Sequence, residues 1–495
     1  MINRPFLIYI SSILLLLTII ISCAVNPVTG KKEFMLMSES QEKALGAQSD
    51  PGIIQAYGLY NDDNLQAFIN ERGQEMVKVS HRPDLEFNFR LLDSPVVNAF
   101  AVPGGYVYFT RGIMAHFNNE AEFAGVLGHE IGHITARHSA KQYSNQMLAQ
   151  VGLMVGIVAN EKFRDFAYDI SQGVGLLFLK FGRDHESQSD ELGVEYSTAV
   201  GYDAHEMADF FQTLNRLQQK AGVTIPDFLS THPNPVNRYN KVHRHADNAQ
   251  ANLDKSKLKI NRDDYLAMID GMIYGDDPAQ GYVDNNVFYH PELKFEFPFP
   301  QEWLLQNTPA QVQMSSPDNK ALMVFTFAQE NTLQAAAQAA AEQFNLTVLE
   351  SQNTRVNGFP AYAMVSEQKP DPQANGPGQQ QEPIRLMSYF IQYDQYIYVF
   401  HGISLKSDFN TFTNDFKQTM TSFKRLTDPK RINVQPTRLV VKTTNQTGPL
   451  NTILQRLGAN YSDLEELSII NGMMLDETVN AGEKLKLFSQ QYNKS

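Results

Sequence analysis

The chain has 495 residues, of which 42% are hydrophobic and 19% are charged. This composition is typical of a globular protein with enough apolar side chains for several domains. The net charge is −13, and an acidic chain lacks the clustered Lys and Arg that phosphate binding requires, which argues against nucleic acid as a partner.

The N-terminus has the pattern of a bacterial lipoprotein signal peptide. Arg4 precedes an apolar run from Phe6 to Ile21 that is shorter than a membrane-spanning helix and leads to Cys23, the only cysteine. We expect residues 1–22 to be removed and Cys23 to carry the lipid. An uncleaved anchor with an ordinary cysteine is the alternative. In both cases the body would be exported, and a mature chain without a spare cysteine fits an oxidising compartment.

Residues 119–133 combine a helix start with a metal-binding pattern. Asn119 is a suitable N-cap with Glu122 as its capping-box partner, so a helix is expected to begin here. The helix runs into His129-Glu130-Ile131-Gly132-His133, where the two histidines lie one turn apart on one face and can reach the same ion. Glu130 projects to the side, where it would act as a general base. The pattern predicts a catalytic site with one Zn²⁺ per chain.

A third ligand is required, because two histidines do not complete a catalytic zinc site. The best candidate is Glu186, in a segment from about Phe178 to Val200 that is predicted to be helical. Asp190 lies one turn further along the same face, where it can accept a hydrogen bond from a ligand histidine and fix its ring. The alternative is a solvated acidic helix face. We interpret His138 and His185 as surface or packing histidines.

An apolar segment, 147–179, lies between these two helices. Its central run is too short to span a bilayer. We expect a helical hairpin packed in the core, and a mobile hydrophobic lid over the cleft is the alternative.

Several ordered segments resemble the HtpX-like and CAAX-prenyl-endopeptidase-like zinc metallopeptidases, which are gluzincins. They are a strand that begins at Asn98, the lead-in to the zinc helix, the 129–133 motif, an Arg-x-x-Glu-x-x-x-Asp pattern at 183–190, and a His-Pro loop at 231–238. The resemblance covers 24–270, and among subgroups it is most similar to the BepA-like exported envelope lipoproteins.

The resemblance implies roles for further residues. His232 would stabilise the oxyanion or occupy an open zinc position, and a loop histidine stacked on Pro233 is the alternative. Arg238 would support the zinc ligands. Gly104 and Gly105 would let a substrate chain approach closely. An extended substrate would pair with the family's active-site edge strand, here Asn98, Ala99, Phe100 and Ala101.

The C-terminal half has a different composition. Residues 273–286 are predicted to be a linker. Residues 287–428 alternate aromatic and β-branched runs with helical stretches, which predicts an α+β domain with an antiparallel sheet, in an order that loosely resembles PsbP-like sandwiches. Residues 436–490 have a βααβ pattern and resemble a LysM-like module, whose family binds peptidoglycan sugars. The usual glycine-aspartate turn is missing at 442–448, so sugar binding and a structural or docking role both remain open.

The sequence therefore predicts a multidomain fold: a mainly α-helical gluzincin peptidase domain at 23–272 with a small β-sheet, then the α+β domain and the LysM-like module. The function expected is a zinc-dependent metalloendopeptidase that cleaves unfolded or misassembled exported proteins. Lipidated Cys23 would anchor it in the bacterial cell envelope, at the outer membrane facing the periplasm. The alternatives are a non-proteolytic, chaperone-like assembly factor, against which Glu130 argues, and a peptidoglycan-associated adaptor, against which the missing turn argues. Few contacts are expected between the peptidase and the segments after Gly275.

Overall fold

The computed structural model describes residues 23–144, 181–221, 228, 232, 235–369 and 382–489. The predicted signal peptide and the apolar segment 147–179 lie outside the described residues. The chain divides into two compact units, one made of Met1–Gly275 with Thr437–Gln490 and the other of Asp276–Pro436 with Gln491–Ser495. Within the part that is described, no helix is both long and apolar enough to cross a membrane.

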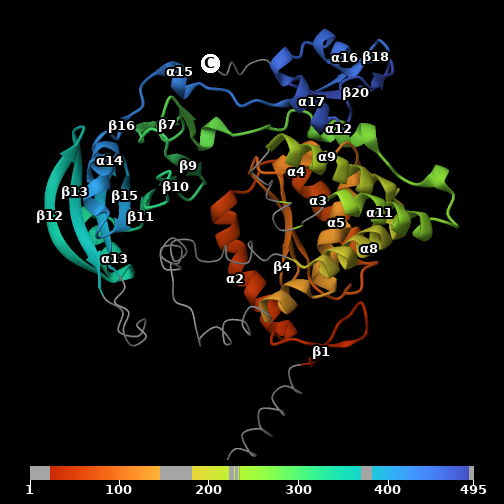
Figure 1. Ribbon diagram of the computed structural model, residues 1–495, viewed down its shortest axis with the longest axis horizontal. Helices are drawn as coiled ribbons and strands as arrows, with labels where there is room; N and C mark the ends of the chain where they lie inside the picture. Colours follow the sequence, from red (N-terminus) through yellow and green to blue (C-terminus); the bar gives the residue numbers. More distant parts are fainter. Residues whose placement is uncertain are drawn as a thin grey trace, which may run out of the picture. The chain divides into compact units, whose positions relative to one another are not determined.

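The first unit consists of helices around a small sheet (Figure 1). Its helices before residue 275 are α2 (Glu39–Tyr57), α3 (Asp63–Val77), α4 (Arg111–His116), α5 (Glu120–Thr135), α8 (Arg183–Ala199), α9 (His205–Ala221), α11 (Pro235–Ala249) and α12 (Arg262–Ile269). Its strands are β1 (Cys23–Val25), β2 (Lys32–Phe34), β3 (Asn88–Leu92), β4 (Ala99–Val102) and β5 (Tyr106–Thr110). The sheet order is β3-β5-β4, with β3 parallel and β4 antiparallel to β5, so β4 is an edge strand.

Helix α5 lies at the centre of this unit. All of its residues are buried, and it packs against α3, α8, α9 and β4. A close helix crossing requires glycine here, because a Cβ on Gly128 would come within 3.0 Å of the Gly193 backbone on α8. The sequence of α5 therefore reflects burial on every side rather than one apolar stripe.

Residues 437–490 also belong to the first unit. β17 (Leu439–Thr443) pairs antiparallel with β20 (Lys484–Phe488), and α16 (Leu450–Arg456) and α17 (Leu464–Ile470) lie between them in the chain. Two shorter strands, β18 (Gly448–Pro449) and β19 (Thr478–Val479), pair with each other. The apolar side chains of this segment form one continuous core with those of α5 and α9. The expectation that few contacts would cross from the peptidase to the segments after Gly275 is therefore wrong for 437–490.

Residues 437–490 pack into the first unit because of the way side chains alternate along β20. Leu485 and Leu487 are fully buried in the apolar core, and the residue between them, Lys486, must point the other way. Its Nζ donates to the carbonyl of Ala115 at 3.0 Å and to that of Phe117 at 2.9 Å, and the whole side chain is buried. A lysine at an alternating position usually faces solvent, so the sequence did not indicate this packing.

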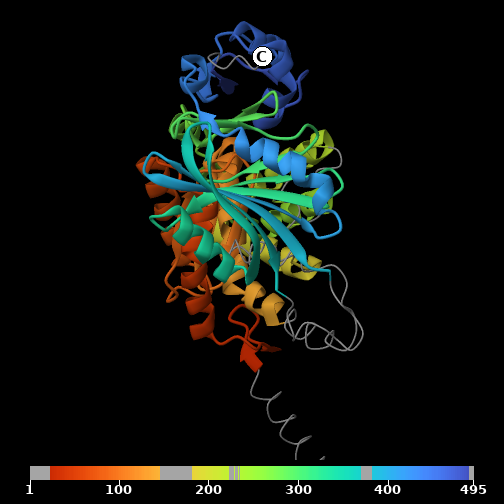
Figure 2. The same ribbon diagram turned by 90° about the vertical axis from the view of Figure 1, so that its left-hand side faces the viewer.

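The second unit has a seven-stranded antiparallel sheet in the order β12-β13-β14-β15-β11-β10-β9 (Figure 2). These strands are β9 (Leu304–Asn307), β10 (Val312–Ser315), β11 (Ala321–Ala328), β12 (Leu346–Val356), β13 (Phe359–Gln368), β14 (Ile384–Tyr393) and β15 (Tyr396–Leu405). A smaller sheet, β16-β8-β7-β6, consists of β6 (Tyr282–Asp284), β7 (Val287–His290), β8 (Phe295–Pro298) and β16 (Lys424–Arg425). The helices are α13 (Leu333–Gln343), α14 (Phe409–Thr421) and α15 (Pro429–Ile432).

Two hydrophobic clusters show how the large sheet is covered. Phe390 and Val399 are cross-strand partners that pack with the alanines of α13, whereas the neighbouring pair Tyr389 and Phe400 packs with Phe416 of α14. Alternate residues of a strand face opposite sides, so the two helices lie on opposite faces. The prediction of a multidomain chain with helices and several sheets is confirmed.

Candidate metal centre

The metal-binding pattern lies on α5, whose start differs in one detail from the sequence prediction. The Asn119 side chain accepts a hydrogen bond from Glu122 N at 2.8 Å, as an N-cap does. The Glu122 carboxylate, however, accepts from Asn118 N at 2.8 Å rather than from Asn119 N. The expected capping box is therefore wrong, because Glu122 bonds one residue further back along the incoming chain.

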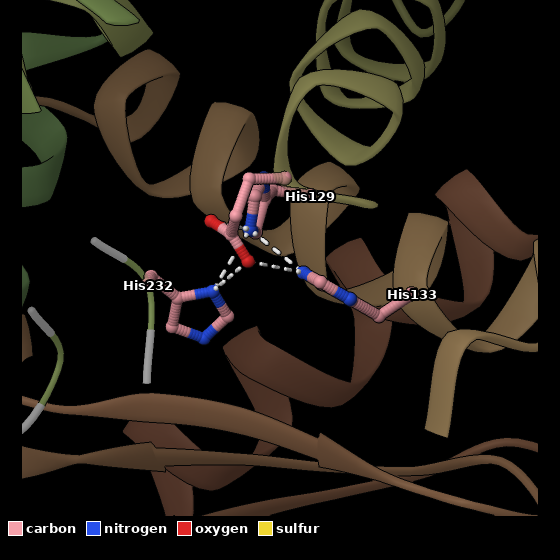
Figure 3. A group of neighbouring side chains, drawn as sticks. His129, His133 and His232 are labelled. Atoms are coloured by element: carbon pink, nitrogen blue, oxygen red, sulfur yellow. Dashed lines mark hydrogen bonds and ion pairs between the residues drawn. The ribbon is translucent and has the colours of Figure 1, made fainter. Parts of the chain in front are cut away.

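Four side chains from three parts of the chain converge beside α5. Ligand atoms of His129, His133, Glu186 and His232 all lie within 4.8 Å of one another, and all four residues are buried. His129 Nε2 is 3.0 Å from His133 Nε2 and 3.3 Å from His232 Nδ1. Glu186 Oε1 is 2.9 Å from His232 Nδ1 and 3.4 Å from His133 Nε2. Figure 3 shows the three imidazoles meeting around one carboxylate.

The chemistry of this donor set fits zinc. Imidazole nitrogens with a carboxylate oxygen are the ligands of catalytic zinc sites. The Nε2 atoms of His129 and His133 face each other at 3.0 Å, an arrangement that needs a proton or a cation between the two lone pairs. Glu186 Oε1 and His232 Nδ1 lie 2.9 Å apart beside them. A cation held among these atoms would neutralise the carboxylate and take up the imidazole lone pairs.

The outward side of His129 is held as the sequence pattern indicated. Its Nδ1 lies 3.0 Å from Asp190 Oδ1. Arg238 contacts Asp190 through both Nε (2.9 Å) and Nη2 (2.6 Å), and its Nη1 lies 3.0 Å from Glu186 Oε2. A carboxylate on Nδ1 keeps the proton there and leaves the Nε2 lone pair free for a metal. Arg238 thereby connects the Asp190 and Glu186 carboxylates.

Burial and charge shift the pKa values of these groups in different directions. Burial lowers the pKa of His133 well below its usual value, which keeps its imidazole neutral. Burial by itself raises the pKa of Glu186, but the positive charges of His232 and Arg238 outweigh burial and hold it well below the usual value. Burial lowers the pKa of His232, but Glu186 and Glu130 outweigh it and the net change is upward.

Glu130 lies beside the cluster and does not belong to it. It is fully buried, and neither carboxylate oxygen has a hydrogen-bond partner among the described residues. Its Oε1 is 3.7 Å from His232 Nε2. Burial raises its pKa above the usual value. A buried carboxylate without a structural partner is costly unless it serves a reaction.

The predicted substrate strand is found at the edge of the sheet. Ala99, Phe100 and Ala101 lie in β4, which packs beside α5, and Asn98 precedes it with a buried Oδ1 that has no partner in the described structure. The glycines that follow lie close to the chain's own backbone. A Cβ on Gly105 would lie 2.1 Å from Glu86 O, so this glycine accommodates the chain's own backbone, and its φ of +100° also favours glycine.

The remaining predicted site residues are placed as follows. Cys23 lies in β1 opposite Phe34. His138, which was interpreted as a packing residue, lies with Nδ1 at 3.1 Å from His133 Nδ1, so sequence reasoning missed a contact with a candidate ligand. The only available signal was its position just after the end of the zinc helix. Segment 147–179, for which a core-packed helical hairpin was expected and a lid was the alternative, lies outside the described residues.

Comparison with known proteins gives a family match for this part of the chain. Residues 63–246 match the model of peptidase family M48. The chain is 30% identical to a mitochondrial metalloendopeptidase OMA1 of Arabidopsis thaliana, over 45% of this chain and 47% of the relative. It is 27% identical to a beta-barrel assembly-enhancing protease of Escherichia coli O157:H7, over 43% of this chain and 45% of the relative. The chain thus spans about half the length of the curated relatives it matches.

Among solved structures, the chain aligns with the cyanobacterial PsbP (CyanoP) of Synechocystis sp. PCC 6803. The alignment covers 30% of this chain and 91% of that protein, with a TM-score of 0.22 and 12% sequence identity.

Proposed function

Because this chain carries a domain of peptidase family M48 at residues 63–246, we propose that the protein is a zinc-dependent metalloendopeptidase that cleaves unfolded or misassembled proteins in the bacterial cell envelope. The observation that carries the proposal is the convergence of His129, His133, Glu186 and His232 beside a buried carboxylate, that of Glu130, which has no structural partner in the described chain. A non-catalytic scaffold protein has no use for a buried carboxylate without a partner, because its burial costs free energy of folding.

His129, His133 and Glu186 would hold one zinc ion. Zinc at this place would supply a Lewis acid that activates water for attack on a peptide carbonyl. Glu130 would accept a proton at a carboxylate oxygen and later return it to the leaving amine. His232 is close enough to both Glu186 and Glu130 to act as a further ligand or as a hydrogen-bond donor to the oxyanion. Arg238 and Asp190 would hold the ligands in place.

The substrate would bind as an extended strand along β4. Among the described residues this strand is paired on one side only, and its other side would offer backbone groups to a peptide. Asn98 adds a buried carbonyl oxygen, Oδ1, that has no partner among the described residues and that a peptide N–H would satisfy. Recognition through the backbone requires an extended, unpaired segment, which unfolded or misassembled proteins expose.

The location in the envelope is supported by the lipoprotein signal-peptide pattern that leads to Cys23 and by the names of the bacterial relatives, which are beta-barrel assembly-enhancing proteases. We propose a lipid anchor at Cys23 in the outer membrane, facing the periplasm. The Asn26 side chain donates to Ala136 O at 3.2 Å, just past the end of the zinc helix. The anchored end of the chain would then be attached directly to the catalytic body.

The test is cleavage of denatured casein by the purified protein. We expect cleavage that stops on chelation and returns with zinc. Glu130→Gln should keep zinc and the fold but lose about 10²–10⁴-fold in rate, the usual cost of losing a positioned general base. Glu195→Gln, on the exposed side of α8, is the matched control and should cleave normally. A Glu130→Gln protein that cleaves casein at the wild-type rate would exclude this mechanism.

The alternatives predict different results in two further assays. A chaperone-like assembly factor would suppress aggregation of denatured protein equally well with and without Glu130. A peptidoglycan-associated adaptor would sediment with purified peptidoglycan through residues 436–490. We propose instead that this segment is structural, because its outer sheet face is packed against α4 and α12 of the same unit.

A further inference from the structure

We propose that His138 is a positioning residue for the metal centre: it holds the ring of His133 so that its Nε2 lone pair faces the zinc site. This inference rests on the proposed function only in taking His133 as a zinc ligand. Nothing in the sequence pattern assigns His138 such a role.

The turn after the zinc helix brings the side chain of His138 into contact with that of His133. Helix α5 ends at Thr135, and Arg137 has a φ of +58°, a left-handed conformation that is unfavourable for a residue other than glycine. Two contacts of Arg137 hold this turn: its Nε donates to Glu42 Oε2 at 3.1 Å and its Nη2 to Met37 O at 2.9 Å. The turn reverses the chain, so that His138 packs against His133 instead of continuing away from it.

The hydrogen bonds of His138 fix which nitrogen carries the proton. Its Nε2 lies 3.0 Å from Gln188 Oε1, an acceptor, so Nε2 carries the hydrogen. Its Nδ1 is then an acceptor, and it lies 3.1 Å from His133 Nδ1 and 3.2 Å from Ser189 Oγ. His133 must donate from Nδ1, which leaves its Nε2 lone pair facing His129 and Glu186.

The opposite tautomer of His138 is incompatible with a metal at His133. A hydrogen on His138 Nδ1 would require His133 Nδ1 to be the acceptor, and the remaining hydrogen of a neutral His133 would then occupy Nε2. That nitrogen could no longer bind a cation. Gln188 therefore sets the tautomer of His138, and His138 sets that of His133.

The two histidines of the motif are thus supported in parallel ways from one helix. Helix α8 supplies Asp190 to His129 Nδ1, and it supplies Gln188 and Ser189 to His138, which in turn contacts His133 Nδ1. The His138 ring also stacks on that of His185, with ring centroids 4.4 Å apart and an angle of 19° between the planes. Such outward partners of metal-binding histidines fix ring orientation and raise ligand basicity.

The test measures zinc affinity by competition with a chromogenic chelator, using the full-length protein. His138→Leu removes the acceptor at similar volume and should weaken zinc binding by about 10–100-fold, the range found for such partners. His138→Asn places an amide oxygen near the position of Nδ1 and should bind zinc closer to wild type than to the leucine variant. Gln188→Leu removes the acceptor that fixes the tautomer of His138 and should weaken zinc binding. Gln188→Glu keeps an acceptor at this position and should bind zinc as wild type does.

His185→Leu is the matched control, because it removes a stacked histidine of the same cluster that makes no described hydrogen bond to a zinc ligand. It should leave zinc affinity unchanged. Long-range ¹⁵N spectra of the imidazoles supply a second readout: wild type should show His138 protonated at Nε2 and His133 at Nδ1, and Gln188→Leu should show a mixture. If His138→Leu does not fold, the asparagine and Gln188 variants still decide the question.

Wild-type zinc affinity in His138→Leu would overturn the proposal, as would equal losses in His138→Leu and His185→Leu, which would indicate general packing. The proposed function can fail separately. A protein that never cleaves peptides but shows the expected series of zinc affinities would keep the positioning role and lose the peptidase. Loss of cleavage in Glu130→Gln together with unchanged zinc affinity in His138→Leu would keep the peptidase and overturn the positioning role of His138.

Discussion

Glu186 lies within ion-pair distance of all three histidines of the metal centre and of Arg238. Its carboxylate lies 3.0 Å from Arg238 Nη1 and 2.9 Å from His232 Nδ1, and it faces both histidines of the α5 motif. Because the whole group is buried, removing this charge takes away the carboxylate closest to His232 and leaves Arg238 with Asp190 alone.

Glu186→Gln should therefore lose metal while the fold is kept. The substitution preserves size but removes the negative charge, and we expect zinc affinity to fall by about 10-fold or more. Elemental analysis after dialysis against a weak chelator measures the retained zinc. Glu195→Gln, on the exposed side of the same helix, should retain it fully. Full zinc occupancy in Glu186→Gln would show that this carboxylate is not a ligand.

A different kind of residue, His401 of β15, makes the second unit sensitive to acid. Burial lowers its pKa from 6.5 to about 4, and its Nδ1 lies 2.8 Å from Ser388 Oγ. The unfolded chain binds a proton between pH 6.5 and 4 that the folded unit does not, so stability is complete above pH 6.5 and is lost as the pH falls toward 4. The loss amounts to about 3 kcal/mol from this residue.

Trp303 provides the measurement, because it is the only tryptophan and it is buried in the aromatic core of this unit. Denaturant unfolding followed by its fluorescence should show lower stability at pH 4.5 than at pH 7. His401→Phe should flatten this dependence. A smaller dependence of stability on pH should remain because of His290. Burial lowers the pKa of this histidine to about 4 as well. Identical slopes in wild type and His401→Phe would contradict the assignment.

At the scale of elements, β20 decides how the C-terminal segment is attached. One face of the strand carries Leu485 and Leu487, and the other face directs Lys486 to the carbonyls of Ala115 and Phe117, immediately before the zinc helix begins. Arg216 of α9 makes a comparable contact, donating through Nη1 to Met473 O at 2.8 Å. These bonds join the segment to α4, α9 and the lead-in to α5.

Lys486→Met should destabilise the first unit by about 1–3 kcal/mol. Methionine fills a similar volume, but the two buried carbonyls lose their donor. Thermal unfolding with and without zinc measures the effect. Lys484→Met is the control on the same strand, where an exposed ion pair with Asp263 contributes less than about 1 kcal/mol. A methionine variant more stable than wild type would mean that the cost of burying the ammonium group exceeds its hydrogen bonds.

At the scale of the whole molecule, the second unit is an insertion in the first. Its ends leave and re-enter the first unit side by side: Tyr274 N donates to Thr437 O at 2.8 Å, and Ile273 forms an antiparallel bridge with Arg438. The chain on both sides of the insertion already has the geometry of a hairpin. A short turn could therefore close the first unit without the second.

We expect a chain with residues 276–436 replaced by an Asn-Gly turn to fold and to bind zinc. A chain that ends at Gly275 should instead be unstable, because it lacks Leu454, Leu467 and the other C-terminal residues of the shared core. Zinc content and thermal unfolding of the two proteins measure the difference. Equal stability of the two shortened chains would contradict the shared core.

The sequence by itself determined whatever depends on positions within one element. Helical spacing places the two histidines of the motif on one face of α5, and Glu186 and Asp190 on one face of α8, wherever those helices lie. Alternating apolar residues likewise indicated the antiparallel sheet of the second unit. A family resemblance followed from short ordered motifs, and the M48 match at residues 63–246 agrees with it.

Only the tertiary structure decided which distant residues pack against these elements. The approach of Gln188 to His138, the burial of Lys486 and the return of residues 437–490 to the first unit all join segments far apart in the chain. A lone histidine after a helix or a lysine in a strand has the same local pattern whether it faces solvent or a buried partner. The partner is chosen by the packing of the whole core, because contacts between distant segments are not encoded in the period of either one.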